Sequence, residues 1–277
     1  MNNCTGQGLK GLKPLWLLAA IATMSMVAIA YYQLRELSSS VRSLQASVVN
    51  QQNSLSDEAM AQKITGLIEA YEKAKRSAAV DAKFAPYQAA LEKTTGKHVY
   101  GNPLARFTLV EFSDLECPYC KRFHSTPKTI VDASKGTVNW EWKHLPLDFH
   151  NPAADQSAMA SECVAELGGN RAFWVFIGEV FRIGRGGGQG VDSVVDLAKD
   201  IGLDEASFNT CITSGRYSVK VATDKAAAGK LGINGTPATF VVDNTTGQSQ
   251  LLGGAQPPEA ILVAIRKLSE QGNTEHN

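Results

Sequence analysis

The chain has 277 residues, of which 44% are hydrophobic, enough to bury at least one sizeable core. Lys and Arg number 27 and Asp and Glu number 27, so the formal net charge is zero. Because no broad basic field exists, the composition argues against a role in nucleic-acid binding.

An uncharged apolar run extends from Leu15 to Tyr32 and follows two lysines. This pattern predicts export, and the run has the minimum length for a helix that crosses about 30 Å of hydrocarbon, so residues 1–32 can remain as a signal anchor. The sequence Ala28-Ile29-Ala30 is also a small-x-small cleavage site, so removal after Ala30 is the alternative. We therefore expect the protein either in a bacterial inner membrane facing the periplasm or free in the periplasm.

A heptad pattern follows the apolar run directly. Because serines dilute its helix propensity, partner helices would have to supply stability. We expect residues 33–97 to form a helical stalk and residues 34–55 to associate as a coiled coil in a homo-oligomer; the alternative is a solvated helix with chance periodicity. The seam positions recur at intervals of three and four: Leu34, Leu37, Val41, Leu44, Val48, Gln51 and Leu55.

Two shorter amphipathic segments complete the stalk. One carries apolar residues between Met60 and Tyr71, and the other between Phe84 and Leu91. The stretch 77–86 between them is expected to be a joint. Glycine, asparagine and proline near residue 97 mark the expected start of the next domain.

Residues 98–272 alternate between strand and helix patterns. Residues 152–231 are mostly helical, so we expect a mixed α/β domain with a helical insertion at about 150–231. The glycine-rich segment 182–190 lacks the features of a phosphate-binding loop and is expected to be a flexible surface loop. The other expected elements are strands at 106–114, 137–147, 238–243 and 249–254 and helices at 118–136 and 257–271.

Cys117 and Cys120 form a C-x-x-C pair with three candidate roles. A zinc site would need about four ligands, and no second cysteine or histidine pair is present, so no metal is expected. A structural bridge would close a very small loop and restrain little chain entropy. Redox exchange is favoured because the pair follows a strand and opens a helix, where the dipole and unpaired N–H groups stabilise a Cys117 thiolate. Cys120 would then resolve mixed disulfides, and Pro118 suits the first helical position.

The stretches "VEFSDLECPYCKRF" and "GINGTPATFVV" resemble the DsbA-like branch of the thioredoxin superfamily over roughly residues 98–270. The resemblance implies a thioredoxin fold with an inserted helical domain and an active-site dipeptide of Pro118 and Tyr119. It also implies a cis-proline at Pro237, preceded by Thr236 and facing the reactive sulfur. Glu111 matches a buried acid under the active site, although a solvent-facing strand position is the alternative.

Cys163 and Cys211 both fall in the expected insertion. A bridge between them would close a loop of about 48 residues, worth roughly 4 kcal/mol in the chain-entropy model. Some DsbA-like relatives carry such a second disulfide and others lack it, so the resemblance supports a structural pairing without requiring it.

The expected function is thiol-disulfide exchange on exported client proteins, without a cofactor and with a DsbB- or DsbD-like membrane redox partner. Thr236 and the stalk resemble isomerases and oligomeric relatives, while the Cys-Pro-Tyr-Cys motif leaves the direction of electron flow open, so oxidase and isomerase both remain. The alternative is a non-catalytic envelope scaffold or chaperone, although a scaffold has no chemical need for this set of residues.

Overall fold

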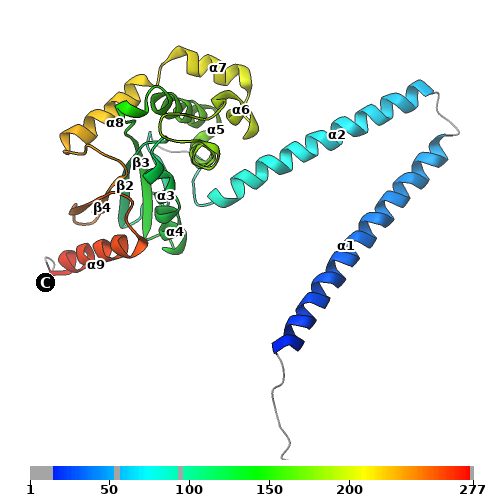
Figure 1. The fold of residues 1–277 in the computed structure, drawn as a ribbon, viewed down its shortest axis with the longest axis horizontal. Helices are drawn as coiled ribbons and strands as arrows, with labels where there is room; N and C mark the ends of the chain where they lie inside the picture. The colour runs from blue at the N-terminus through cyan, green and yellow to red at the C-terminus, as the bar shows by residue number, and fades with distance from the viewer. Residues whose placement is uncertain (1–14, 53–56, 93–95, 275–277) are drawn as a thin grey trace, which may run out of the picture. The chain divides into compact units, whose positions relative to one another are not determined.

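The computed structural model describes residues 15–52, 57–92 and 96–274, and it describes only the backbone of 15–23, 49–52, 57–58 and 273–274. Contacts divide the chain into two compact units, residues 1–72 and 73–277. Each unit is considered by itself below (Figure 1).

The described residues form a five-stranded sheet in the order β1-β3-β2-β4-β5. Strands β2 and β3 are parallel, and the other neighbouring pairs are antiparallel. Branched and aromatic side chains dominate the central strands, which are buried. The bounds are β1 (His98–Gly101), β2 (Phe107–Ser113), β3 (Val138–His144), β4 (Ala238–Asp243) and β5 (Ser249–Gly253).

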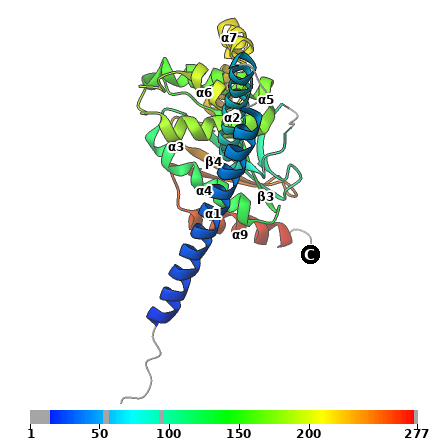
Figure 2. The same cartoon turned by 90° about the vertical axis from the view of Figure 1, so that its right-hand side faces the viewer.

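Helices pack against the sheet, and α9 contacts strands β4 and β5 as well as helix α4. In Figures 1 and 2 the inserted helices α5, α6 and α7 gather at one end and the C-terminal helix α9 lies at the other. Because α3 and α4 directly follow β2, Cys117 and Cys120 lie at the junction of sheet and helices. The bounds are α3 (Pro118–Phe123), α4 (Ser125–Ala133), α5 (Ala153–Ile183), α6 (Val194–Asp200), α7 (Glu205–Ser214), α8 (Ser218–Lys230) and α9 (Pro258–Thr274).

The core is aromatic and centres on α5. Trp140 and Trp142 of β3 pack against Trp174 of α5, with ring centroids 4.4 and 6.4 Å away. Helix α5 is kinked at Gly169, which has φ 81°. A side chain there would lie 2.5 Å from the Glu92 carbonyl, so glycine lets the segment before β1 approach the helix.

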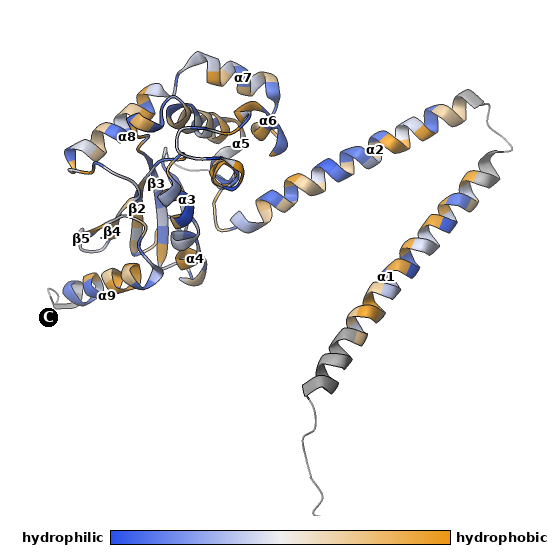
Figure 3. Cartoon of the chain, viewed as in Figure 1, coloured by the Kyte–Doolittle hydropathy of each residue, from blue (hydrophilic) through white to orange (hydrophobic). Residues whose placement is uncertain are grey.

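The N-terminal unit is helical. Helix α1 (Leu15–Gln52) contains the expected seam, and the described apolar seam residues from Leu34 to Val48 are exposed in the single chain. Orange and blue segments alternate along α1 in Figure 3. Leu55 and the Gln51 side chain lie outside the described residues.

No helix in the described part of the chain is long and apolar enough to cross a membrane. The side chains of residues 15–23, half of the expected anchor or signal run, lie outside that description, as does Cys4.

The structure departs from the expected elements in three places. Helix α2 (Asp57–Phe84) continues through the expected joint, because its alanine-rich end favours helix until the 3-10 turn η1 (Ala85–Tyr87), which contains Pro86. The expected helix 118–136 is divided at His124 into α3 and α4. Strand β1 was not expected, because four residues carry little pattern and pairing with β3 defines them.

Candidate active site

Cys117 lies in the short connection between β2 and α3, directly before the first residue of the helix. Its backbone is extended, with φ −77° and ψ 121°, and it caps the helix, while Pro118 occupies the first turn. Proline costs no hydrogen bond there, because first-turn N–H groups have no acceptor within the helix. The free N–H groups of the turn and the helix dipole therefore stabilise a negative charge on the Cys117 sulfur.

Hydrogen bonding lowers the pKa of Cys117 from 9.0 to about 5. The largest contribution is the hydrogen bond with the Cys120 side chain; burial opposes it, and Thr236 and the backbone of residues 119 and 120 lower the pKa further. In the structure both cysteines are free thiols, and 4% of Cys117 is exposed. The arrangement favours a thiolate on Cys117 at neutral pH.

Cys120 lies one turn further along α3 and has no exposed surface. Burial, together with the neighbouring Cys117, raises the pKa of Cys120 well above its ordinary value. The two thiols are therefore distinct: Cys117 is disposed to ionise, and Cys120 keeps its proton.

Glu111 of β2 is fully buried and faces the cysteines. Burial raises its pKa from 4.5 to about 8. Ser113 and Trp140 favour the carboxylate, but neither forms a well-aligned hydrogen bond with it. The alternative of a solvent-facing Glu111 is therefore wrong, and the side chain is a buried acid able to exchange a proton near neutral pH.

The Thr236–Pro237 turn lies across from the sulfur. The peptide bond between these residues is cis, and the Cys117 thiol donates to the Thr236 carbonyl over 3.5 Å. The structure thus brings Cys117, Cys120, Thr236, Pro237 and Glu111 into one site. A second cis bond precedes Pro152, which the sequence did not indicate.

The dipeptide between the cysteines faces outward. Pro118 is exposed, and Tyr119 is 57% exposed with the Arg122 guanidinium 4.5 Å from its ring centroid. An exposed ring next to a nearly buried thiol offers apolar contact to an incoming protein segment.

Asp114 fixes the turn that precedes Cys117. Its carboxylate accepts hydrogen bonds from the backbone N–H groups of Glu116 at 2.7 Å and Leu147 at 3.0 Å. It also lies 2.7 Å from Nδ1 of His150, in the 3-10 turn η2 (Asp148–His150). Sequence reasoning did not identify this anchor, because two of its partners, Leu147 and His150, are more than 30 residues away in the chain.

The glycine-rich segment packs against the residue before Cys117. The Gly187 N–H donates to the Glu116 carbonyl at 2.7 Å, and the Gly190 N–H donates to the Glu116 carboxylate at 2.9 Å. Gly188 has φ 84°, and a side chain there would lie 3.2 Å from the backbone of His150. The expectation of a flexible surface loop needs correction: this segment forms a wall of the site and requires glycine to do so.

Cys163 of α5 and Cys211 of α7 form a disulfide. Both residues are buried, and the bond joins two helices of the insertion. Neither sulfur is free to exchange while this bond is intact.

His98, His144 and Glu162 are described residues that could hold a metal ion, with ligand atoms within 4.8 Å of one another. However, the Trp142 indole, which can only donate, is 3.2 Å from His144 Nδ1. His144 Nε2 must therefore carry the proton and donate to Glu162 at 3.1 Å, and a protonated nitrogen cannot bind a metal. We interpret this cluster, which the sequence did not reveal, as a buried hydrogen-bonded network.

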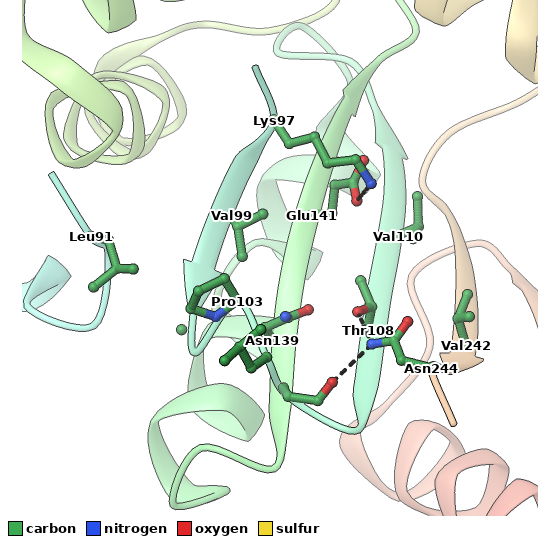
Figure 4. Close-up of a pocket in the computed structure, with 13 residues that line it drawn as sticks. Leu91, Lys97, Val99, Pro103, Thr108, Val110, Asn139, Glu141, Val242 and Asn244 are labelled. Carbon is green, nitrogen blue, oxygen red and sulfur yellow. Dashed lines mark hydrogen bonds and ion pairs between the residues drawn. The ribbon is translucent and has the colours of Figure 1, made fainter. Parts of the chain in front are cut away.

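A groove of about 630 Å³ lies on the face of the sheet to which Thr108, Val110 and Glu141 belong. Figure 4 shows the residues that line it. Thr108 and Val110 line it from β2, and because strand side chains alternate, Glu111 points to the other face. Lys97 spans its edge and reaches Glu141 at 2.9 Å. Neither active-site cysteine lines the groove, so it is separate from the candidate site.

The family model that matches this chain and the solved structures that resemble it agree with each other. The thioredoxin family model Thioredoxin_4 matches residues 93–254. Among solved structures, DsbA2 of Pseudomonas aeruginosa is 35% identical, with a TM-score of 0.56 over 62% of this chain and 94% of that one. A thioredoxin-like oxidoreductase from Silicibacter pomeroyi DSS-3 is 27% identical, with a TM-score of 0.53 over 64% of this chain and 94% of that one.

The curated relatives are longer proteins. The Na(+)/H(+) antiporter NhaA 3 of Salinispora tropica is 32% identical over 145 residues, which is 52% of this chain and 21% of the antiporter. NhaA 1 of Salinispora arenicola gives 30% identity and the same coverage. The chain thus spans about a fifth of the length of the curated relatives it matches.

Proposed function

Since this chain belongs to the thioredoxin family, in its Thioredoxin_4 branch with DsbA-like structural neighbours, we propose that it is an exported thiol-disulfide oxidoreductase. It forms or isomerises disulfides in exported client proteins through the Cys117 and Cys120 pair. The observation that carries this proposal is a Cys117 thiol with a lowered pKa, placed at a helix N-terminus beside the cis Thr236–Pro237 bond.

In the oxidising direction a client thiolate attacks the Cys117 sulfur of the Cys117–Cys120 disulfide. That bond breaks, a mixed disulfide forms, and Cys120 leaves with the electron pair and takes up a proton. A second client thiolate then attacks the client sulfur, which releases Cys117 as a thiolate. Two electrons pass from the client to the protein, and the low pKa of Cys117 makes it the better leaving group.

Isomerisation begins from the reduced pair. The Cys117 thiolate attacks a client disulfide, and a mixed disulfide is resolved either by another client thiolate or by Cys120. Glu111, with its pKa near 8, is placed to take the proton from Cys120 in the second route. Both directions therefore use the same residues, and the redox partner decides between them.

Trapping tests the proposal. A Cys120→Ala variant keeps the nucleophile and removes the resolving thiol, so mixed disulfides with envelope proteins should accumulate and disappear on reduction. A Cys117→Ala/Cys120→Ala variant is the control and should trap nothing. If the single variant also traps nothing while it is stably folded, the proposed exchange does not occur.

Two further features support our proposal that the protein is exported to the periplasm. The apolar run 15–32 supports export, with residues 1–32 as an inner-membrane anchor or as a signal removed after Ala30. The Cys163–Cys211 disulfide is suited to the periplasm, because such bonds persist in oxidising compartments. A DsbB-like partner would reoxidise the pair, whereas a DsbD-like partner would reduce it.

The direction of electron flow is tested by alkylation in cells. A mostly oxidised Cys117–Cys120 pair indicates an oxidase, and a mostly reduced pair indicates an isomerase or a reductase. The polar Thr236 and the exposed seam of α1, which we propose assembles several copies around a stalk, favour isomerase activity.

A non-catalytic envelope scaffold or chaperone is the second candidate. The specific feature that favours it is the long N-terminal helical region, which offers an attachment surface independent of the cysteines. Trapping separates the two, because a scaffold with a permanently oxidised pair gives no mixed disulfides.

A further inference from the structure

Two different surfaces border the Cys117 sulfur. On one side lies the turn around Thr236 and Pro237, whose cavity is lined entirely by uncharged residues. On the other side a small cavity of about 30 Å³ separates Cys117 from the glycine-rich segment, and Lys121 and Arg185 line it. The two sides of the reactive sulfur therefore differ in charge.

Lys121 is the main positive charge on the side of Cys117 that faces the glycine-rich segment. It lies on α3 one turn after Cys117, is exposed, and donates from Nζ to the Gly184 carbonyl at 3.0 Å. This hydrogen bond holds the ammonium group against the wall of the cavity rather than in free solution. Within the described part of the chain, no carboxylate forms an ion pair with Lys121.

No exposed acid among the described residues on this side is free to pair with Lys121. Glu116, the acid that lines the same cavity, is 1% exposed, and its carboxylate accepts the Gly190 N–H. Asp192 neutralises Arg185 at 2.7 Å. Arg122 adds a further cation beside the exposed Tyr119 ring. The exposed charges that carry no ion pair on this side of the described structure, Lys121 and Arg122, are therefore both positive.

We propose that Lys121 gives this protein a preference for client segments that carry an acidic residue beside the reacting cysteine. A client carboxylate that approaches the glycine-rich side would meet a positioned ammonium group that no exposed acid of the described chain pairs with. Complementary charge raises the rate of encounter and disfavours basic segments. The inference rests on the proposed exchange reaction and names the class of client.

The test uses the oxidised full-length protein and two dithiol peptides that differ only beside the reacting cysteine, with Asp in one and Lys in the other. The Asp peptide should be oxidised about two- to fivefold faster, the range expected for one exposed ion pair. The ratio should fall toward one as salt is added, because exposed charges are screened.

Variants assign the effect to Lys121. Lys121→Gln should bring the ratio close to one, and Lys121→Arg should keep it. Lys135→Gln is the matched control, since Lys135 is exposed and precedes β3, at the end of the sheet opposite Cys117, and it should leave the ratio unchanged.

The outcomes separate the two proposals. Equal rates for both peptides, or a preference that survives in Lys121→Gln, would overturn the inference and leave the proposed function intact. Failure of both peptides to react would instead contradict the proposed function on which the inference rests.

Discussion

The two active-site thiols have opposite electrostatic surroundings although three positions separate them. Cys117 receives hydrogen bonds at a helix N-terminus, which favour its thiolate, whereas burial keeps Cys120 protonated. In the reaction that we propose, exchange starts at Cys117 and is completed by Cys120. Reactivity is therefore set by local contacts, and single substitutions around the sulfur can test it.

Replacing Thr236 with valine should raise the pKa of Cys117. The two side chains are similar in volume, but valine lacks the buried Thr236 hydroxyl, which has no hydrogen-bond partner among the described residues and can donate to a Cys117 thiolate. The thiolate absorbance followed against pH measures the shift. Thr108→Val on the opposite sheet face is the control, and an unchanged pKa in Thr236→Val would show that the hydroxyl has no role.

Replacing Glu111 with glutamine should change how stability depends on pH. Because the folded state raises the pKa of Glu111 from 4.5 to about 8, the folded protein holds an extra proton in this window. Its free energy of unfolding therefore falls as pH rises through the window. Glutamine has no proton to lose. The contribution of Cys117 to the pH dependence of the free energy of unfolding is common to both proteins, so it cancels when they are compared.

The measurement is urea unfolding of wild type and Glu111→Gln at several pH values. The stability of the variant relative to wild type should increase between about pH 5 and pH 8, by on the order of a few kcal/mol. A difference that stays constant with pH would mean that Glu111 keeps an ordinary pKa.

Among the elements, the segment around Gly184–Gly190 shows how a loop can become part of a site. Two of the hydrogen bonds that hold it end on Glu116, one on the backbone carbonyl and one on the side chain, and a third comes from Lys121 Nζ to the Gly184 carbonyl. The position of Gly190 therefore depends on a side chain more than 60 residues earlier.

Glu116→Ala should release this segment, whereas Glu116→Gln retains an acceptor for the Gly190 N–H. We expect a loss of about 1–2 kcal/mol in the alanine variant and a smaller loss in the glutamine variant. Hydrogen exchange of the Gly190 amide measures the release directly. Equal protection in both variants would show that other contacts hold the segment.

The same segment marks the limit of prediction from sequence. The thioredoxin fold with inserted helices was predicted, because Cys117 follows a strand and because a short motif identifies Pro237. The wall at Gly187 and the His98–His144–Glu162 network depend on contacts between distant parts of the chain. Local patterns do not contain such contacts, and strand β1 was missed for the same reason.

For the whole molecule, the open structural question is association. The apolar seam residues of α1 are exposed, for example Leu37 at 63% and Leu44 at 63%, and exposed apolar stripes on a helix favour partner helices. We predict that residues 33–277 form an oligomer at micromolar concentration in sedimentation experiments. A Leu37→Asp/Leu44→Asp variant should be a monomer, and a monomeric wild-type fragment would contradict the proposed stalk.

The central claim is that Cys117 exchanges disulfides with other proteins. The most direct test is mass spectrometry of full-length Cys120→Ala after incubation with a small disulfide-bonded client. The account predicts one mixed disulfide, located on Cys117 and absent from Cys117→Ala/Cys120→Ala. A folded Cys120→Ala protein whose Cys117 is alkylated readily but never joins the client would contradict it.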